Sequence, residues 1–278
     1  MIKSLLVAVD SSAHAQAALE HAVSLAGAYR ARILGLNVLD IRYVEMPPYL
    51  DYSYAFGAVP PVLAPLDLMQ RFRDKGDRIL GDLRAKVVEA GLPVDTRVEE
   101  GVPGQVIADL AKGHDLVILG KRGEHAKWGR DLLGSAAEAV TKRSTVPVLL
   151  VEEKARPLKK ALVMFDGSEP ADRALRLAAD LALHAALGLT VLTANDDPKQ
   201  GEAVLDAARA YLGSLKLEAA YLVAPGKPAR AASAAMVDHP VDVVVMGMRG
   251  HSVIHDLILG RTTEQLMRSV QVPVLLVP

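Results

Sequence analysis

The amino-acid sequence repeats one long pattern, and this repeat constrains the fold more than any other feature. Near residue 115 the chain reads DLVILGKRG, and near residue 242 it reads DVVVMGMRG. A Leu-Gly pair follows each segment, and the identical stretch VPVLLV ends each copy. Each copy has the pattern of a buried strand, a glycine loop, a helix and a second strand. Long repeats of this kind indicate tandem copies of one structural unit, so we predict two copies of an α/β domain.

Composition argues against several functional classes. The chain has 278 residues, of which 51% are hydrophobic and 23% charged, which is enough for two domains with buried cores. Its net charge is −1 and it has no basic stripe, so we expect no nucleic-acid binding. No apolar run approaches the roughly 18 to 20 residues of a membrane span, so we expect no membrane partner. The absence of cysteine fits a reducing, cytoplasmic location.

Apolar strands alternate with helices along each half of the chain. Each half opens with a short apolar strand that ends in an aspartate, Asp10 or Asp166, and an alanine-rich helix follows over about residues 13–30 or 170–186. Strands that are apolar on both faces and alternate with helices are typical of a parallel sheet covered on both sides. The predicted fold is α/β, with two tandem, doubly wound, open parallel five-stranded sheet domains.

The predicted domains are residues 1–154 and 157–278. A charged segment containing Pro157 lies between the two copies and is typical of a domain junction.

An insertion rich in aromatic residues and proline is predicted near residues 41–66. It explains why Asp10 and Asp166 are 156 residues apart while the matching glycines, Gly120 and Gly247, are 127 apart. The insertion holds five aromatic residues, although aromatic residues make up 4% of the chain. Long loops are often functional. The segment is therefore either an extended loop packed on the domain surface or a lid or partner-binding patch, and the sequence leaves both open.

Each copy places glycines where a parallel sheet binds its ligands. In such sheets ligands bind at the carboxyl ends of strands, where the strand order reverses. One glycine ends a predicted strand, a second lets the backbone approach a ligand closely, and a third precedes a helix whose free N–H groups and dipole favour an anion. Neither a Walker A loop nor a G-x-G-x-x-G motif occurs. The glycines are Gly120, Gly123 and Gly134 in the first copy and Gly247, Gly250 and Gly260 in the second.

This arrangement resembles the universal stress protein family in its tandem two-domain form. The nucleotide motif of that family is a glycine, two residues, a glycine, nine residues, a glycine, and a serine or threonine. The first copy has ten residues in place of nine and keeps the hydroxyl group as Ser135. The second copy keeps nine residues but continues with Arg261 and Thr262. Its unbroken spacing slightly favours the second copy as the one that binds.

The resemblance implies binding of an adenine nucleotide, ATP, accompanied by Mg²⁺. The aspartate after the first strand would contact the nucleoside, and the end of the second strand would meet the adenine. The glycines, the hydroxyl residues and the arginines would hold the phosphates. The implied residues are Asp10, Ser11, Val38, Gly120, Arg122, Gly123, Gly134 and Ser135 in the first copy, and Asp166, Gly167, Ala194, Gly247, Arg249, Gly250, Gly260, Arg261 and Thr262 in the second.

The resemblance also implies how the two copies assemble. Single domains of the family pair through their last strands into a two-fold dimer. The two VPVLLV segments would then form an intramolecular pseudo-dimer, which would cover two otherwise sticky sheet edges. The sequence leaves open whether two whole chains form a homodimer.

Structural roles compete with the binding roles of these residues. The glycines would also suit tight strand–helix turns, and each strand-ending aspartate would suit a helix cap. Ser135 and Glu138 fit a capping box without any ligand. Arg261 would either pair with a phosphate or fill the pocket and close it. His14 and His21, seven residues apart on the first helix, are expected at the surface.

The sequence favours a stress-associated binding protein over an enzyme. It contains no nucleophile elbow, no HExxH motif and no telling pair of carboxylates, and we predict no metal site and at most a slow ATPase. Nucleotide binding would then regulate conformation or the choice of a protein partner. The alternative is a degenerate, non-nucleotide scaffold or a carrier of another small apolar or phosphorylated ligand.

Overall fold

The computed structural model describes residues 1–42, 65–124, 133–248 and 261–278. The side chains of residues 65–68, 261 and 262 are outside this description. Most of the predicted insertion at 41–66 therefore lies outside the described residues, and its role stays a prediction.

Strands and helices alternate through both repeats, as the sequence predicts. The first repeat consists of β1 (Ser4–Ala8), α1 (Ala13–Tyr29), β2 (Arg32–Asp40), α4 (Pro65–Glu89), β3 (Val94–Gly101), α5 (Pro103–Ala111), β4 (Leu116–Gly120), α6 (Ser135–Arg143) and β5 (Val148–Val151). The second consists of β6 (Lys160–Met164), α7 (Glu169–Ala185), β7 (Gly188–Ala194), α8 (Pro198–Ser214), β8 (Ala219–Ala224), α9 (Pro228–Asp238), β9 (Val243–Gly247), α10 (Arg261–Ser269) and β10 (Val274–Val277).

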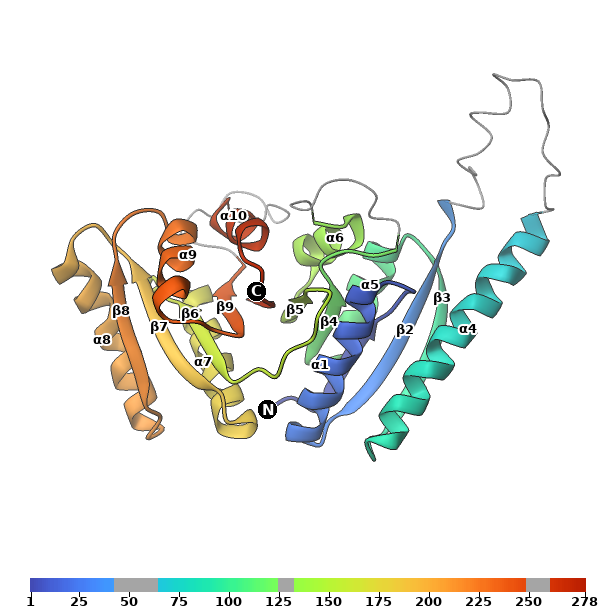
Figure 1. Cartoon of the computed structure of the whole chain (residues 1–278), viewed down its shortest axis with the longest axis horizontal. Coiled ribbons are helices and arrows are strands. Elements are labelled where there is room, and N and C mark those ends of the chain that lie inside the picture. The colour runs from blue at the N-terminus through green and yellow to red at the C-terminus, as the bar shows by residue number, and fades with distance from the viewer. Residues whose placement is uncertain (43–64, 125–132, 249–260) are drawn as a thin grey trace, which may run out of the picture.

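One sheet runs through both repeats (Figure 1). Its strand order in the described part of the chain is β3-β2-β1-β4-β5-β10-β9-β6-β7-β8, and the β5–β10 pair is antiparallel whereas the other neighbouring pairs are parallel. At the antiparallel seam Leu149 lies opposite Leu275. The order is the same from either end when the repeats are exchanged, so a pseudo-two-fold axis passes between β5 and β10. The predicted pairing through the last strands is confirmed, and it joins the two five-stranded halves into one ten-stranded sheet.

Helices cover both faces of the sheet. Side chains of α1, α4, α7 and α8 pack into one core cluster, and those of α5, α6, α9 and α10 pack into the other. Leu5 and Leu6 of β1 are both fully buried, one in each cluster. Successive strand side chains point to opposite faces, which is why the strands are apolar at every position. Among the described residues, no helix is both long and apolar enough to cross a bilayer.

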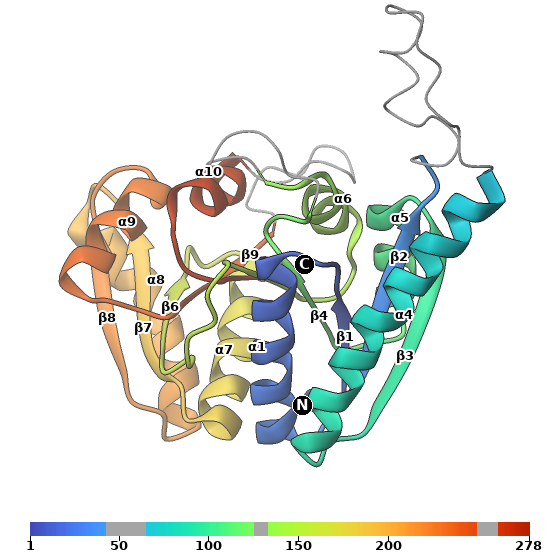
Figure 2. The same ribbon diagram turned by 45° about the vertical axis from the view of Figure 1, so that its right-hand side comes forward.

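A second contact joins the repeats where α1 and α7 pack together (Figure 2). The Tyr29 hydroxyl donates a hydrogen bond to Asp180 at 2.9 Å. The Tyr29 ring stacks on His184 with the ring centroids 4.7 Å apart. The repeats are therefore held together by strand pairing and by helix packing.

Candidate functional site

The predicted residues of the first repeat gather where the strand order reverses. β1 has β2 on one side and β4 on the other, so the carboxyl ends of β1 and β4 border a switch point of the sheet. Asp10 follows the end of β1, and Gly120 ends β4. The start of α6 lies at the same edge because the Gly134 N–H donates to the Lys121 carbonyl at 2.8 Å. Figure 2 shows α6 and α10 at the upper edge of the molecule, one over each repeat.

The Asp10 carboxylate organises this edge. Its Oδ1 accepts from the Ser12 N–H at 2.9 Å, and its Oδ2 accepts from the Glu124 N–H at 2.8 Å. The side chain that caps α1 is that of Ser12, which accepts from the Ala15 N–H. The interpretation of Asp10 as a mere helix cap is therefore wrong, because its carboxylate ties the loop after β4 to the end of β1.

Gly123 is required by the closeness of this carboxylate. A Cβ atom at Gly123 would lie 2.6 Å from Asp10 Oδ2. Atoms at such a distance overlap, so a larger residue would displace the carboxylate or the loop. The glycine therefore permits a close approach of the loop to the Asp10 carboxylate, and its contact with a phosphate stays a prediction.

Gly120 and Gly247 are explained by packing alone. A Cβ atom at Gly120 would lie 2.4 Å from the Cβ of His14, and one at Gly247 would lie 2.7 Å from the Cβ of Pro170. His14 and Pro170 are equivalent first-turn residues of α1 and α7. Each glycine lets the first helix of its repeat pass across the end of the strand, so the structural interpretation accounts for both without a ligand.

Ser135 stands at the first position of α6, with Gly134 as the N-cap residue. The N-cap has no side-chain hydrogen bond, and the Glu138 carboxylate is 2.6 Å from Lys142 Nζ. The predicted capping box of Ser135 and Glu138 is therefore wrong. The exposed Ser135 hydroxyl and the first N–H groups of α6 are oriented as a helix N-terminus presents itself to an anion.

Two charged residues that the sequence did not single out enter this site. The Glu124 carboxylate accepts a hydrogen bond from the Ser11 hydroxyl and lies 2.6 Å from Lys75 Nζ of α4. Lys75 comes from a helix that starts directly after the insertion, so only the fold brings it to the glycine loop. The sequence places Glu124 directly after Gly123, but it does not reveal that the Glu124 side chain turns toward Ser11.

Val38 and Ala194 occupy equivalent places at the ends of β2 and β7. Both are half-buried, and both pack against the core cluster beneath α5 and α9. The next position inward is Asn37, whose buried amide donates to the Val9 carbonyl at 2.8 Å. Val38 thus gives the end of β2 an apolar surface, and its contact with a planar base stays a prediction.

The second repeat is only partly described. The Asp166 carboxylate accepts from the Ser168 N–H at 3.0 Å, which repeats the geometry of Asp10 and Ser12. Gly167 has φ of +76°, a left-handed conformation that suits glycine.

The glycine loop of the second repeat belongs mostly to the undescribed part. Arg249, Gly250 and Gly260 lie outside the described residues, and Arg261 and Thr262 open α10 with undescribed side chains. Within the described residues, the predicted binding residues can therefore be followed more fully in the first repeat than in the second.

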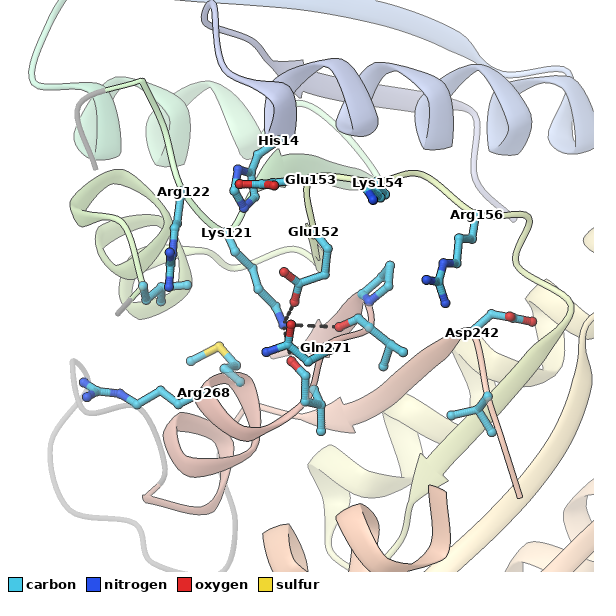
Figure 3. Close-up of a pocket in the computed structure, with 16 residues that line it drawn as sticks. His14, Lys121, Arg122, Glu152, Glu153, Lys154, Arg156, Asp242, Arg268 and Gln271 are labelled. Carbon is cyan, nitrogen blue, oxygen red and sulfur yellow. Dashed lines mark hydrogen bonds and ion pairs between the residues drawn. The ribbon is translucent and has the colours of Figure 1, made fainter. Parts of the chain in front are cut away.

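A polar cleft lies between the two repeats and is lined by residues of both (Figure 3). Its volume is about 480 Å³. Arg122, predicted to face phosphates, is half-buried and lines this cleft. The lining residues are His14, Lys121, Arg122, Leu133, Glu152, Glu153, Lys154, Arg156, Val241, Asp242, Met267, Arg268, Val270, Gln271, Val272 and Pro273.

Lys121 crosses this cleft and fastens the first repeat to the second. Its ammonium group pairs with Glu152 and donates to the carbonyl oxygens of Val270 and Val272 at 3.0 and 3.2 Å. Burial lowers the pKa of Lys121, and the nearby Glu152 carboxylate opposes that change. A comparison of the two copies could have pointed to this residue, because the two glycine loops differ here: the position of Lys121 is taken by Met248 in the second copy.

Comparison with known proteins gives a consistent result. The model of the universal stress protein family matches residues 1–152 and 157–278. The chain is 30% identical to universal stress protein Slr1230 of Synechocystis over 287 aligned positions, covering 99% of both chains.

Solved structures agree with this assignment at the level of the fold. A universal stress protein from Archaeoglobus fulgidus matches with a TM-score of 0.80 and 23% identity, over 99% of this chain and 97% of its own. A putative universal stress protein from Pseudomonas aeruginosa matches with a TM-score of 0.67 and 18% identity, over 99% of this chain and 93% of its own.

Proposed function

Because the chain belongs to the universal stress protein family, we propose that it is a stress-associated protein that binds ATP with Mg²⁺ at the edge of its first repeat. The observation that carries this proposal is the contact between Asp10 and Gly123. A carboxylate at the end of β1 lies directly against a glycine of the loop after β4, and a Cβ atom there would overlap it. The two halves of the family motif thus meet in space at a switch point of the sheet.

The first repeat supplies groups for each part of the nucleotide. Val38 would lie against the adenine, and Asp10 would accept hydrogen bonds from the ribose. The backbone N–H groups at Gly123 and the start of α6, with the Ser135 hydroxyl, would hold the phosphates. Bound Mg²⁺ would supply charge neutralisation of those phosphates.

Lys75 would change partners when nucleotide binds. It now lies 2.6 Å from the Glu124 carboxylate, and both side chains are partly exposed. An exposed ion pair contributes only about 0–1 kcal/mol, so a phosphate could replace Glu124 at little cost. Binding would then release Glu124 from Lys75 and change the charges at this edge of the protein. This change gives nucleotide binding a means to regulate the surface of the protein rather than to drive rapid hydrolysis.

We also propose a second nucleotide site in the second repeat, where fewer of the predicted residues are described. Asp166 and Gly167 repeat the turn of the first repeat, and Ala194 and Gly247 hold the equivalent strand ends. Arg249, Gly250, Gly260, Arg261 and Thr262 would complete a second site.

One observation favours a second candidate function, a non-nucleotide scaffold. The Glu124 carboxylate stands beside the glycine loop and is held there by Ser11 and Lys75. A fixed carboxylate would repel phosphates. If Glu124 stays in place, the first repeat would act as an interaction module, with a protein partner or a different small ligand, in the cytoplasm.

A matched pair of variants tests the proposal. We expect Asp10→Ala to weaken calorimetric binding of ATP–Mg²⁺ at least about tenfold, since a charge-assisted hydrogen bond contributes roughly 1.5–3 kcal/mol. The same titration of Asp166→Ala leaves the tightest site intact if the first repeat binds. Thermal unfolding of each variant without ligand controls for loss of fold. Equal ATP affinity of wild type and Asp10→Ala would contradict the assignment.

A further inference from the structure

We propose that the cleft between the repeats binds one small organic molecule with two separated phosphate groups. The cleft includes Lys121 and Arg122 of the first glycine loop, but its lining contains none of Asp10, Val38, Gly123 and Ser135, so it goes beyond the proposed ATP site. It is lined by the first turn of α1, the loop after β4, the segment after β5, and α10 with the chain that follows it. Its volume of about 480 Å³ is within the usual range for small-molecule sites.

The charges of the cleft favour an anion. Five of its lining residues are Lys or Arg and three are Asp or Glu. Two of the three carboxylates are already engaged, because Glu152 pairs with Lys121 and Asp242 Oδ2 accepts the N–H groups of Lys159 and Lys160 at 2.9 Å each. In the described part of the chain, Lys154 and Arg156 have no carboxylate within ion-pair distance.

The cations form two groups at opposite ends. Figure 3 shows Arg122 and Arg268 at one end of the cleft and Lys154 and Arg156 at the other. The Lys121–Glu152 pair lies between the two groups. Arginine binds phosphate through a planar fork of N–H donors, so it is the residue expected around phosphate groups. Two cationic ends therefore fit a ligand with a phosphate at each end.

The cleft belongs to one side of the pseudo-two-fold axis. Met248 and Pro278 take the places of Lys121 and Glu152 in the second repeat. The connection that carries Lys154 and Arg156 joins β5 to β6 and so passes from the first repeat to the second. Glycine loops occur in both repeats, but within the described residues this arrangement of charges is found only on the side of Lys121. The proposal therefore predicts one such ligand per chain, whatever the number of nucleotides.

Arg268 can contribute to phosphate binding by exchanging its present ion pair with Glu264 for one with the phosphate. It pairs with Glu264 on its own helix at 2.7 Å, with 46% and 50% of the two side chains exposed. Such an exposed pair is weak and is screened by salt. A phosphate held also by Arg122 would compete with Glu264 for this guanidinium group.

Calorimetry at fixed ionic strength tests the proposal with fructose 1,6-bisphosphate as the probe and fructose 6-phosphate as its one-phosphate counterpart. We expect one bisphosphate per chain and binding of the monophosphate that is about tenfold weaker or more. Arg156→Gln should weaken the bisphosphate about fivefold to tenfold while changing monophosphate binding little. Arg230→Gln removes an equally exposed arginine from α9, away from the cleft, and should leave both titrations unchanged.

Two results would overturn the proposal. Equal affinity for the two sugar phosphates would show that the two cationic ends do not act together. Bisphosphate binding that is lost in Gly123→Val but kept in Arg156→Gln would assign it to the glycine loop instead. Because ATP binding is measured separately through Asp10→Ala, failure here leaves the proposed nucleotide site standing.

Discussion

Lys121 shows how one residue distinguishes two copies of the same motif. It is buried, and its ammonium group is shared between Glu152 and two carbonyl groups of the other repeat. Met248 takes the same place in the second repeat and is also buried. This buried position is thus occupied by an apolar side chain in one repeat and, in the other, by an ammonium group with an ion-pair partner and two hydrogen-bond acceptors.

Replacement of Lys121 should be costly unless its partner changes too. We expect Lys121→Met to lower the free energy of unfolding by about 2–4 kcal/mol, because Glu152 loses its counter-charge in a half-buried place. Adding Glu152→Gln should recover part of that loss. Denaturant unfolding of Lys121→Met, Glu152→Gln and the double variant measures this coupling. Additive effects of the two substitutions would contradict it.

His14 and His21 correct an expectation drawn from the sequence. Both are buried rather than exposed at the surface. For His14 the reason is that the first turn of α1 crosses the end of β4, where a Cβ atom at Gly120 would lie 2.4 Å from the His14 Cβ. That contact joins segments far apart in the chain, so the helical pattern of α1 does not reveal it.

The buried histidines make stability depend on pH. Burial lowers the pKa of His21, and its Nε2 has no hydrogen-bond partner among the described residues. The unfolded chain therefore takes up this proton first, and stability falls as the pH drops below the ordinary histidine pKa of about 6.5.

His21→Leu tests this pH dependence. The variant should lose less thermal stability between pH 7 and pH 5 than the wild-type protein. Burial lowers the pKa of His14 and His114 as well, so part of the wild-type loss should persist. Parallel melting curves of the variant and the wild type against pH would exclude His21 as a contributor.

At the scale of elements, the sequence predicted the helices and strands closely. The helix expected over about residues 13–30 spans Ala13–Tyr29, and the helix expected over about residues 170–186 spans Glu169–Ala185. A short run that is apolar at every position and alternates with helices leaves few alternatives to a buried parallel strand. The charged contacts at the site, such as that of Lys75 with Glu124, join segments far apart in the chain, so no local pattern could predict them.

The strand seam between β5 and β10 is one of the contacts that join the repeats. Leu275 of β10 is 2% exposed and lies opposite Leu149 of β5. We expect Leu275→Ala to cost about 2–5 kcal/mol, the usual range for a buried leucine. Leu183→Ala, at a 55% exposed position of α7, should change stability by less than about 0.5 kcal/mol. Similar losses for both variants would contradict the packing of the seam.

At the scale of the whole molecule, the fold is one sheet built from two copies of one unit, whose last strands pair. The fold and the family follow from the repeat, from the glycine motifs and from the matches to both halves. The site could be predicted less fully from the sequence. The extra residue in the first glycine spacing favoured the second copy, whereas the described residues bring Asp10 and Gly123 together in the first. The cleft between the repeats could not be predicted, since it exists only once they are paired.

Native mass spectrometry of the intact chain with ATP and Mg²⁺ tests the central claim most directly, because it counts bound nucleotides. The proposed site predicts a species with one ATP per chain, and a second if the other repeat also binds. The bound species should disappear in Asp10→Ala if one site is occupied. A wild-type protein that shows only the bare chain at ATP concentrations well above 1 mM would contradict nucleotide binding.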